Sequence, residues 1–363
     1  MLITNHLNVQ IAGDSHGPAI YSTIENFPFG FKIDEEAIND DLKLRQTGYG
    51  RGARMKQEHD NICLESGVWN GKTTGMPLVM RIKNRGSYPE GRERRTVPRP
   101  GHADYAAYSK FGDPDMRIYA EGASARRTAG IVATGSLCRQ WLKEKGVSCL
   151  GFVSGCGGIE RDISISAETD LNSIRMKRDN SPVFCPDEDL TKQIITTIDK
   201  MRENGDTLGG RIGIIVRGLK PGYGSFSSVE TRLDALLAGN VMGIPSVKGC
   251  FIGEPAVHRL RGSEAHDRFI NGSDRIKRAS NNAGGIEGGI SNGTDIMMNA
   301  YLKPIPSLRM GIDSVDVLTG KKERVEYVRS DVTAIAPAAI VLESIVSIII
   351  ADFFLFENGG GRG

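Results

Sequence analysis

The chain has 363 residues, 39% of them hydrophobic, and its 46 Lys and Arg against 44 Asp and Glu give a formal net charge of +2. A chain of this length can bury a core without disulfides or metals, and its near neutrality argues against a protein that coats nucleic acid or an acidic membrane. Glycine is in excess, with 45 residues, about 12% of the chain against a usual ~7%. Because these glycines follow no Gly-X-Y period and form no linker, we expect them to serve local roles in an enzyme-sized chain.

The predicted secondary structure mixes helices and strands. In chain order, residues 7–12 form a strand, 34–44 a helix with an acidic first turn, 124–145 a long helix, 187–203 a helix and 212–216 a buried strand, and a last helix begins near residue 337. The sequence has no fixed-period repeat and no Pro- or Ser-rich linker. We therefore predict one large domain of mixed α/β (α+β) class that spans residues 1–363.

The most apolar run, residues 340–356, is interrupted by Glu343 and Asp352. We predict a buried helix rather than a membrane span, because the run is short and charged for ~30 Å of hydrocarbon. The six cysteines are scattered without a C-x-x-C pair, and the N-terminus lacks the pattern of a secretory signal. Reduced, mostly buried thiols in a cytoplasmic protein are expected.

Positive charge is concentrated in the first third of the chain. Residues 43–56 carry five cations and no acid, and residues 81–99 carry seven cations and two acids. A nucleic-acid-binding protein is therefore one alternative. It is disfavoured because residues 81–99 contain a single aromatic, Tyr88, and no recognised binding module.

Residues 13–17, GDSHG, follow the first predicted strand and match G-x-S-x-G, the nucleophile elbow of α/β-hydrolases. The context differs, because Pro18 follows at once and a catalytic histidine would come from far downstream, where His258 and His266 lie. A serine hydrolase and a plain turn stay open as alternatives. We favour a different use of Ser15 and His16.

Residues 45–54, RQTGYGRGAR, place Arg45, Arg51 and Arg54 on a glycine-rich loop. Glycine lets a backbone approach a ligand closely, and guanidinium groups pair bidentately with carboxylate or phosphate. A formal match to the dinucleotide fingerprint is accidental, because a helix precedes the loop where that motif needs a strand. The loop is predicted to hold an anion, and a solvated basic loop is the alternative.

Further along the chain, His102 stands between a Pro-Gly turn and a predicted helix, where a histidine is well placed as a general acid; a structural role is the alternative. Ser124 is a predicted N-cap whose helix start can bind an anion. Residues 282–293 are dense in glycine, which suits a flat or phosphorylated ligand or a plain surface loop. The six histidines show no metal-ligand spacing, so no metal site is predicted.

Taken together and in their order along the chain, these segments resemble the chorismate synthase family, and the resemblance covers nearly the whole chain. The matching motifs are GDSHG, R-x-x-x-x-G-R-G-x-R-M, RPGHADY, G-A-S-A-R-x-T-A, IPSVKG at 244–249, N-x-x-G-G-x-x-G-G-I-S-N-G, and R-x-D at 329–331. The resemblance implies a β-α-β sandwich, usually a homotetramer. It also implies a reaction in which 5-enolpyruvylshikimate 3-phosphate loses phosphate and a ring hydrogen by anti-1,4-elimination to give chorismate.

The resemblance further implies a requirement for reduced FMN, although the net reaction is redox-neutral. Because the chain lacks the extra length of forms that reduce their own flavin, we expect an outside flavin reductase, and thus NADPH indirectly, to supply it. Neither nucleic acid nor membrane is an expected partner. Binding of a reduced pyridine nucleotide, where the family has it, is implied for Arg45 and Arg51.

Residue roles are likewise implied by the resemblance. His16 would protonate the departing phosphate, His102 would serve the flavin near N1, and Asp331 would act near flavin N5. Implied substrate contacts are Ser15, Arg45, Arg51, Arg54, Arg99, Ser124, Arg126 and Arg329. Implied flavin contacts are Gly122, Ala123, Ser124, Pro245, Ser246, Gly288, Lys303, Pro304, Ile305, Pro306, Ser307 and Arg329, with Arg45 and Arg51 for the nucleotide.

The chain departs from the family pattern at three places. Gly122 stands where the family often has Arg, Ile305-Pro306 replaces a more usual hydroxyl-bearing pair, and Ser330 stands where His is common. The first two departures change the expected flavin contacts and leave the expected activity as it is.

Overall fold

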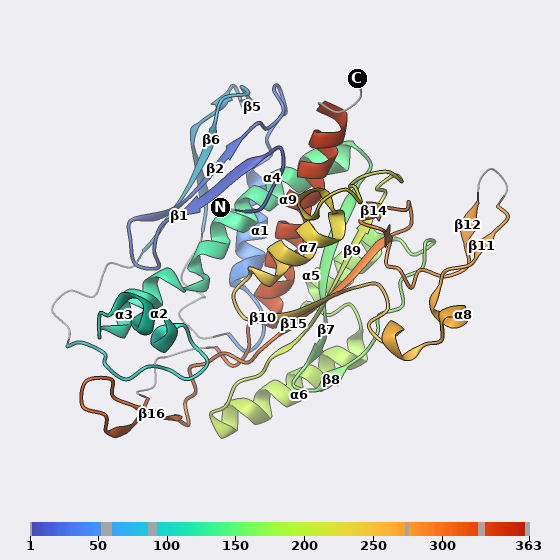
Figure 1. The fold of residues 1–363 in the computed structure, drawn as a ribbon. Helices are drawn as coiled ribbons and strands as arrows, with labels where there is room; N and C mark the ends of the chain where they lie inside the picture. The colour runs from blue at the N-terminus through green and yellow to red at the C-terminus, as the bar shows by residue number, and fades with distance from the viewer. Residues whose placement is uncertain (1, 52–59, 86–92, 273–275, 326–330, 360–363) are drawn as a thin grey trace.

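The computed structural model describes residues 2–51, 60–85, 93–272, 276–325 and 331–359. Its described elements form three layers, in which two antiparallel sheets enclose a layer of helices (Figure 1). One continuous hydrophobic cluster runs through all three layers. The predicted mixed fold class and the β-α-β sandwich are therefore confirmed.

The smaller sheet comes entirely from the first quarter of the chain. Its strand order is β1 (Asn8–Ala12), β2 (Ala19–Glu25), β6 (Leu78–Lys83) and β3 (Ile62–Ser66), and every pair is antiparallel. Buried residues alternate along β2 and β6, so this sheet has one face on the core and one toward solvent. The strand predicted at 7–12 is β1.

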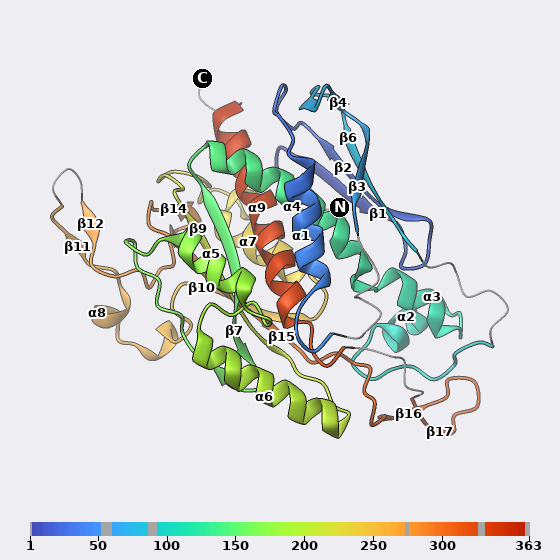
Figure 2. The same ribbon diagram turned by 180° about the vertical axis from the view of Figure 1, so that it is seen from behind.

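The larger sheet has the strand order β10 (Val247–Ile252), β15 (Ile296–Leu302), β9 (Gly210–Arg217), β7 (Ser148–Cys156) and β8 (Ile159–Glu160). The strand predicted at 212–216 is the centre of β9. After its first residue β7 is buried throughout, because α9 (Ile335–Gly359) covers one face and α5 (Leu171–Asn180) the other (Figure 2).

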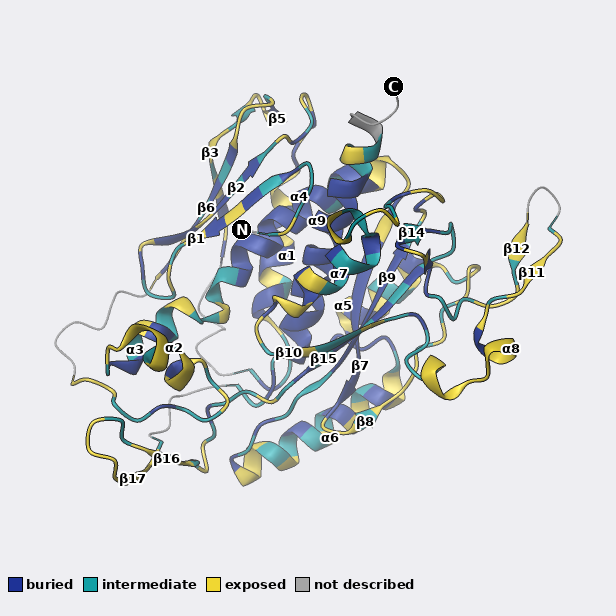
Figure 3. Ribbon diagram, in the orientation of Figure 1, coloured by how far each residue is buried: buried dark blue, intermediate teal, exposed yellow. Residues whose placement is uncertain are grey.

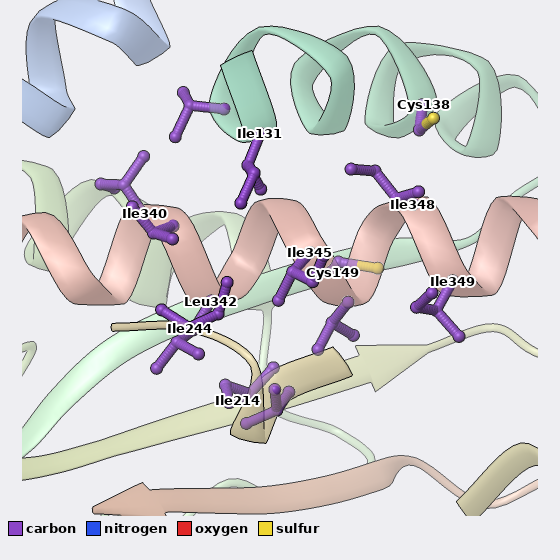
Figure 4. Close-up of a cluster of buried hydrophobic side chains, with 14 of the residues drawn as sticks. Ile131, Cys138, Cys149, Ile214, Ile244, Ile340, Leu342, Ile345, Ile348 and Ile349 are labelled. Atoms are coloured by element: carbon purple, nitrogen blue, oxygen red, sulfur yellow. The ribbon is translucent and has the colours of Figure 1, made fainter. Parts of the chain in front are cut away.

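The middle layer consists of α9, α4 (Thr128–Glu144), α1 (Glu35–Gln46) and α7 (Leu233–Met242). In the close-up of Figure 4, Ile131 reaches from α4 toward α9, Ile348 points back toward α4, and Leu342 points toward the strands. Because α9 has neighbours on opposite sides, it is apolar around most of its circumference.

The last helix is longer than its sequence pattern indicates. It starts at Ile335 and has 25 residues, so the expectation that the apolar run is too short to span a membrane is wrong as regards length. By length and composition α9 is the one membrane-span candidate among the described residues, but 83% of its most apolar window is buried inside the protein. The prediction of a buried core helix is confirmed.

Two other predicted helices are confirmed with small changes at their ends. The segment predicted at 124–145 starts as a 3-10 turn, η2 (Ala125–Arg127), in which the Ser124 hydroxyl accepts the N–H of Arg126, and it continues as α4. The helix predicted at 187–203 is α6 (Glu188–Asn204), capped by the Asp187 carboxylate and ended by Gly205 in the left-handed region.

The remaining elements are short, and Figure 3 shows that α2, α8 and the hairpins β11–β12 and β16–β17 are mostly exposed. These remaining elements are β4 (Val68–Trp69), β5 (Lys72–Thr73), α2 (Asp104–Phe111), α3 (Met116–Gly122), η3 (Val229–Thr231), η4 (Val257–Arg259), α8 (Gly262–Ala265), β11 (Phe269–Ile270), β12 (Lys277–Arg278), β13 (Ile286–Glu287), β14 (Ile290–Ser291), β16 (Asp313–Val315) and β17 (Lys322–Arg324).

The cysteines agree with the expectation of reduced and mostly buried thiols. All six are free, and Cys138, Cys149, Cys156 and Cys185 are buried. Burial raises the pKa of the Cys149 thiol to about 12, so this thiol is an inert core group.

Candidate active site

Most of the predicted site residues lie at one end of the helical layer. The β1–β2 loop, the C-terminal end of α1, and the N-terminal ends of α4 and α9 meet near α2 and α3, at the lower left of Figure 1. The turn after α1 touches α9 directly, because a Cβ on Gly48 would collide with Ala336. Residues from five separate stretches of sequence are thus brought to one region.

His16 is held by a carboxylate that the sequence argument did not assign to the site. Its Nδ1 lies 2.6 Å from Oε1 of Glu121, and its backbone N–H donates to Oε2 of the same residue at 2.8 Å. The His16 side chain is 33% exposed and that of Glu121 is 17% exposed. With Nδ1 engaged, Nε2 is the ring nitrogen available to a ligand.

The loop that carries His16 is fixed on its other side as well. The side-chain amide of Asn84, just beyond β6, donates to the carbonyl oxygens of Asp14 at 2.9 Å and Gly17 at 2.7 Å. Gly13 has φ +109°, and a Cβ there would collide with the carbonyl oxygen of Ala19. The GDSHG segment is therefore a tight, well-supported connection between antiparallel strands.

This connection excludes the nucleophile-elbow interpretation of Ser15. An elbow leads from a strand into a helix, whereas residues 13–18 lead from β1 into its antiparallel partner β2. The candidate triad histidines, His258 and His266, lie in and beside η4 and α8, on the opposite edge of the molecule from α3 (Figure 1).

Arg45 and Arg126 share the buried carboxylate of Asp60. Arg126 Nη1 lies 2.5 Å and Arg45 Nη1 3.5 Å from its Oδ2. Arg126 Nε also donates to Asn84 at 2.8 Å, and Arg45 Nε donates to the hydroxyl of Thr128 at 3.1 Å. These arginines thus tie α1, the start of α4 and the GDSHG loop together, and their contacts with a ligand stay a prediction.

His102 belongs to a second carboxylate-held group. Its Nδ1 lies 2.5 Å from Oδ1 of Asp104, and Arg99 Nε donates to Oδ2 of Asp104 at 2.8 Å. The Asp104 side chain is 1% exposed. Burial alone would raise the pKa of Asp104, but the hydrogen bonds from His102 and Arg99 outweigh it and hold that pKa far below its usual range.

Asp331 and Arg51 form a third pair, with Arg51 Nε 3.3 Å from Asp331 Oδ2. The loop before Arg51 is anchored to α6, because the Tyr49 hydroxyl donates to Asp199 at 2.9 Å and Arg202 lies over the Tyr49 ring at 5.1 Å. The N–H of Val332 in turn donates to the carbonyl of Gly50 at 2.9 Å. These contacts place Asp331, the predicted catalytic aspartate, beside the predicted anion-binding loop.

The segments predicted to hold the flavin partly converge on this region. The N–H of Lys303 donates to the carbonyl of Ser246 at 2.9 Å, and Lys303 Nζ donates to the carbonyl of Gly101, beside His102. Ser246 has φ +72°, a left-handed conformation that costs a non-glycine residue about 1–3 kcal/mol and is often found at functional sites. Pro245 and the remaining segment, Pro304, Ile305, Pro306 and Ser307, flank these contacts in the chain.

Gly122, Ala123 and Ser124 lead from α3 into η2 beside Glu121. Apart from its two neighbours in the chain and the backbone of its own helix, no described residue has a heavy atom within 4 Å of where a Cβ on Gly122 would stand. The Ser124 hydroxyl is an N-cap, as predicted.

Gly288 is the exception among the predicted flavin contacts. It lies in the β13–β14 hairpin, which precedes β15 in the chain, whereas Lys303 follows β15. Most glycines of residues 282–293 are required by the protein itself, because a Cβ on Gly284, Gly285 or Gly289 would strike the backbone of Gly253, Asp295 or Ser225. Close backbone packing explains these three glycines, and the contact of Gly288 with a flavin stays a prediction.

Arg54 and Arg329 lie outside the described residues. Among the described residues, no group of three His, Cys, Asp or Glu side chains is arranged to hold a metal ion.

The sequence motifs contain the cations and histidines of this candidate site, but three of the acids that pair with them were not predicted. Asp60, Asp104 and Glu121 pair with Arg126, His102 and His16 respectively. Asp104 carried a usable signal, since it stands two residues after His102 in the same motif. Asp60 and Glu121 carried none, because their partners are distant in sequence.

Two carboxylate-held histidines and several ion-paired arginines lie at one end of a three-layer fold, an arrangement that makes this end a candidate enzyme active site. Comparison with known proteins gives the family. The chorismate synthase family model matches residues 7–355. The chain therefore belongs to the chorismate synthase family.

Individual relatives agree with this assignment. The chain is 44% identical over 357 residues to chorismate synthase from Thermotoga maritima, covering 98% of this chain and 93% of that protein. It is 39% identical to the enzyme of the same name from Carboxydothermus hydrogenoformans, covering 97% and 94%. A crystal structure of chorismate synthase superposes with a TM-score of 0.81 at 31% identity, covering 98% of this chain and 94% of that one.

Proposed function

We propose that the protein converts 5-enolpyruvylshikimate 3-phosphate into chorismate and inorganic phosphate by an anti-1,4-elimination, as a carbon–oxygen lyase of aromatic amino-acid biosynthesis. In this reaction a ring C–O bond to phosphate and a ring C–H bond break, and a new ring double bond forms. The observation that supports the proposal best is the pairing of Nδ1 of the partly exposed His16 with Glu121, which leaves Nε2 as the ring nitrogen for a ligand.

His16 is assigned the proton that the departing phosphate takes up. A phosphate leaves more readily when it is protonated, and positioned general acids contribute about 10²–10⁴-fold to rate. The surrounding arginines, Arg51 and Arg99 among them, are assigned to the substrate's anionic groups, because guanidinium forks pair with carboxylate and phosphate.

His102 and Asp331 are assigned to the flavin side of the site. A hydrogen bond with Asp104 already orients His102, and an ion pair with Arg51 already orients Asp331. Such orientation holds a proton-transfer group in position before the ligand arrives.

The residues present fit reduced FMN. The Lys303 ammonium, the Ser246 backbone and the N-capped turn at Ser124 are the donors proposed for a phosphate, and Gly122 adjoins the Ser124 turn. When bound, reduced FMN would supply an electron to the substrate transiently and recover it, so that the overall reaction stays redox-neutral. An outside flavin reductase that draws on NADPH is proposed to keep the flavin reduced.

We further propose a cytoplasmic homotetramer. This assembly is the one that membership of the chorismate synthase family implies. Light scattering coupled to size-exclusion chromatography tests the assembly, and a monomer at micromolar concentration would contradict it.

Anaerobic turnover tests the activity. Purified protein mixed with reduced FMN and 5-enolpyruvylshikimate 3-phosphate is expected to release chorismate and phosphate in equal amounts. Omitting the reductase and supplying only oxidised FMN with NADPH should give no product. Absence of chorismate under reducing conditions would overturn the proposed activity, and product formation from NADPH alone would overturn the need for an outside reductase.

A further inference from the structure

Glu121 contacts His16 at two points at once. One carboxylate oxygen accepts the backbone N–H of His16 at 2.8 Å, and the other lies 2.6 Å from Nδ1 of the same residue. Glu121 is on the last turn of α3, and His16 is on the β1–β2 loop, so the two come from elements that are separated by 105 residues. Two contacts to one residue fix both the position of the loop and the rotation of the ring.

The chemistry of a carboxylate decides which ring nitrogen carries the proton. An ionised carboxylate only accepts hydrogen bonds, so Nδ1 must be protonated to bond with Glu121. In the neutral ring the other nitrogen, Nε2, is then the one without a proton, free to take up and deliver it. The same arrangement lets the ring carry two protons, because Glu121 accepts from Nδ1 in either state.

We infer that Glu121 is the positioning residue that fixes the tautomer and orientation of His16. This inference rests on the proposed function for its kinetic consequence, but not for its structural one. Glu121 touches no reacting atom in this account; it acts only through His16.

The isosteric variant Glu121→Gln has a specific expected effect. The backbone N–H of His16 can only donate, so the single oxygen of the glutamine side chain would stay with it. The glutamine NH2 group would then face Nδ1, which would have to accept a hydrogen bond. The proton of the neutral ring would move to Nε2, and a doubly protonated ring would set one N–H group against another.

Two readouts test this inference. In protein labelled with ¹⁵N-histidine, the His16 signals, assigned by their loss in His16→Asn, should report Nδ1–H in the wild type and Nε2–H in Glu121→Gln. In the anaerobic assay, kcat should fall about 10²-fold in Glu121→Gln with KM for the phosphorylated substrate unchanged. Glu121→Asp, which keeps the carboxylate, should keep the Nδ1–H tautomer and recover part of kcat.

Glu264→Gln is the matched control. Glu264 likewise accepts a backbone N–H and a side-chain N–H, from Arg261 at 3.3 Å and 3.1 Å, but it lies on α8 at the opposite edge of the molecule. This variant should leave the His16 signals and kcat unchanged. Equal melting temperatures of the two glutamine variants would exclude general unfolding as the cause of a lost rate.

The outcomes separate this inference from the proposed function. A His16 tautomer that is the same in wild type and Glu121→Gln, or a wild-type kcat in that variant, would overturn the positioning role. A wild-type protein that forms no chorismate would overturn the proposed function, while the tautomer comparison would still decide whether Glu121 positions His16.

Discussion

At the scale of single residues, the site consists of charged side chains that are already paired before any ligand binds. His16, His102 and Arg51 each have a carboxylate partner, in Glu121, Asp104 and Asp331. Pre-paired groups are held in position without ligand, which lowers the cost of organising the site during catalysis.

Asp104→Asn is expected to slow the reaction, because the buried carboxylate holds both His102 and Arg99. An asparagine keeps the shape but places an NH2 group against one of these donors. We expect kcat to fall by about 10²-fold, the scale of a misplaced proton-transfer group, in the anaerobic assay.

Asp170→Asn is the control for that substitution. Asp170 caps α5 by accepting the N–H groups of Asn172 and Ser173, a role that asparagine also fills. The kcat of the Asp170→Asn variant should equal that of the wild type. A wild-type rate in Asp104→Asn as well would remove Asp104 from the organisation of the site.

At the scale of elements, Glu343 joins three helices and a strand. From α9, its carboxylate binds Arg139 of α4 at 2.7 Å, Arg175 of α5 at 2.7 Å and Arg178 of α5 at 2.5 Å, and it accepts the N–H of Gly151 in β7 at 3.0 Å. Burial would raise the pKa of Glu343, but the three arginines outweigh burial and hold that pKa far below its usual range.

Glu343→Gln should therefore lower the free energy of unfolding by about 3–5 kcal/mol at neutral pH, because it removes the buried charge that the three arginines share, although Arg139 keeps Asp41 and Arg178 keeps Asp179. A lowered folded-state pKa contributes stability that is present above the ordinary Glu pKa of ~4.3 and is lost as pH falls through the folded-state value. Urea unfolding from pH 7 down to pH 3 should show the wild type losing more stability than the variant. Parallel pH profiles would contradict this role; Glu65→Gln, at a surface pair with Arg81, serves as control.

Gly135 allows α4 and α9 to pack closely, since a Cβ there would collide with Ser344. Alanine normally favours a helix over glycine by about 1 kcal/mol, yet Gly135→Ala should destabilise the protein by about 1–3 kcal/mol through overpacking. Gly239→Ala on α7 is the comparison, because the nearest atom to its Cβ would be Ile3 Cδ1 at 3.9 Å. Thermal unfolding should lower the Tm of the first variant and not that of the second; equal shifts would contradict the packing argument.

Periodicity in the sequence predicted the elements whose pattern is local. The helices α1 and α6 and the strand β9 were predicted because their apolar spacing and caps lie within one element. The α9 helix was underestimated, since its polar residues suggested an interruption where the fold instead buries Glu343 and Asp352 with partners from other elements. Neither sheet's strand order was predictable, because pairs such as β7 with β9 join residues that are distant in the chain.

At the scale of the whole molecule, the excess of glycine has two explanations rather than one. Gly13 serves the loop that carries His16, whereas Gly284, Gly285 and Gly289 allow backbone segments far from His16 to pack against each other. Sequence motifs report both uses in the same way, since each requires a residue without a side chain. Only the three-dimensional arrangement separates glycines near the site from glycines that close the fold.

The same arrangement brings His16 and His102 to one end of the helical layer. Their carboxylate partners lie on two different helices, Glu121 on α3 and Asp104 on α2. We propose that this end of the molecule carries out the elimination of phosphate, with both histidines taking part.

The most direct test is one anaerobic assay of the wild type, His16→Ala and His102→Ala with reduced FMN and 5-enolpyruvylshikimate 3-phosphate, following chorismate and phosphate together. The wild type is expected to form both products in equal amounts, and each variant to be slower by about 10²–10⁴-fold. Near wild-type rates in both variants, or no chorismate from the wild type, would contradict the account.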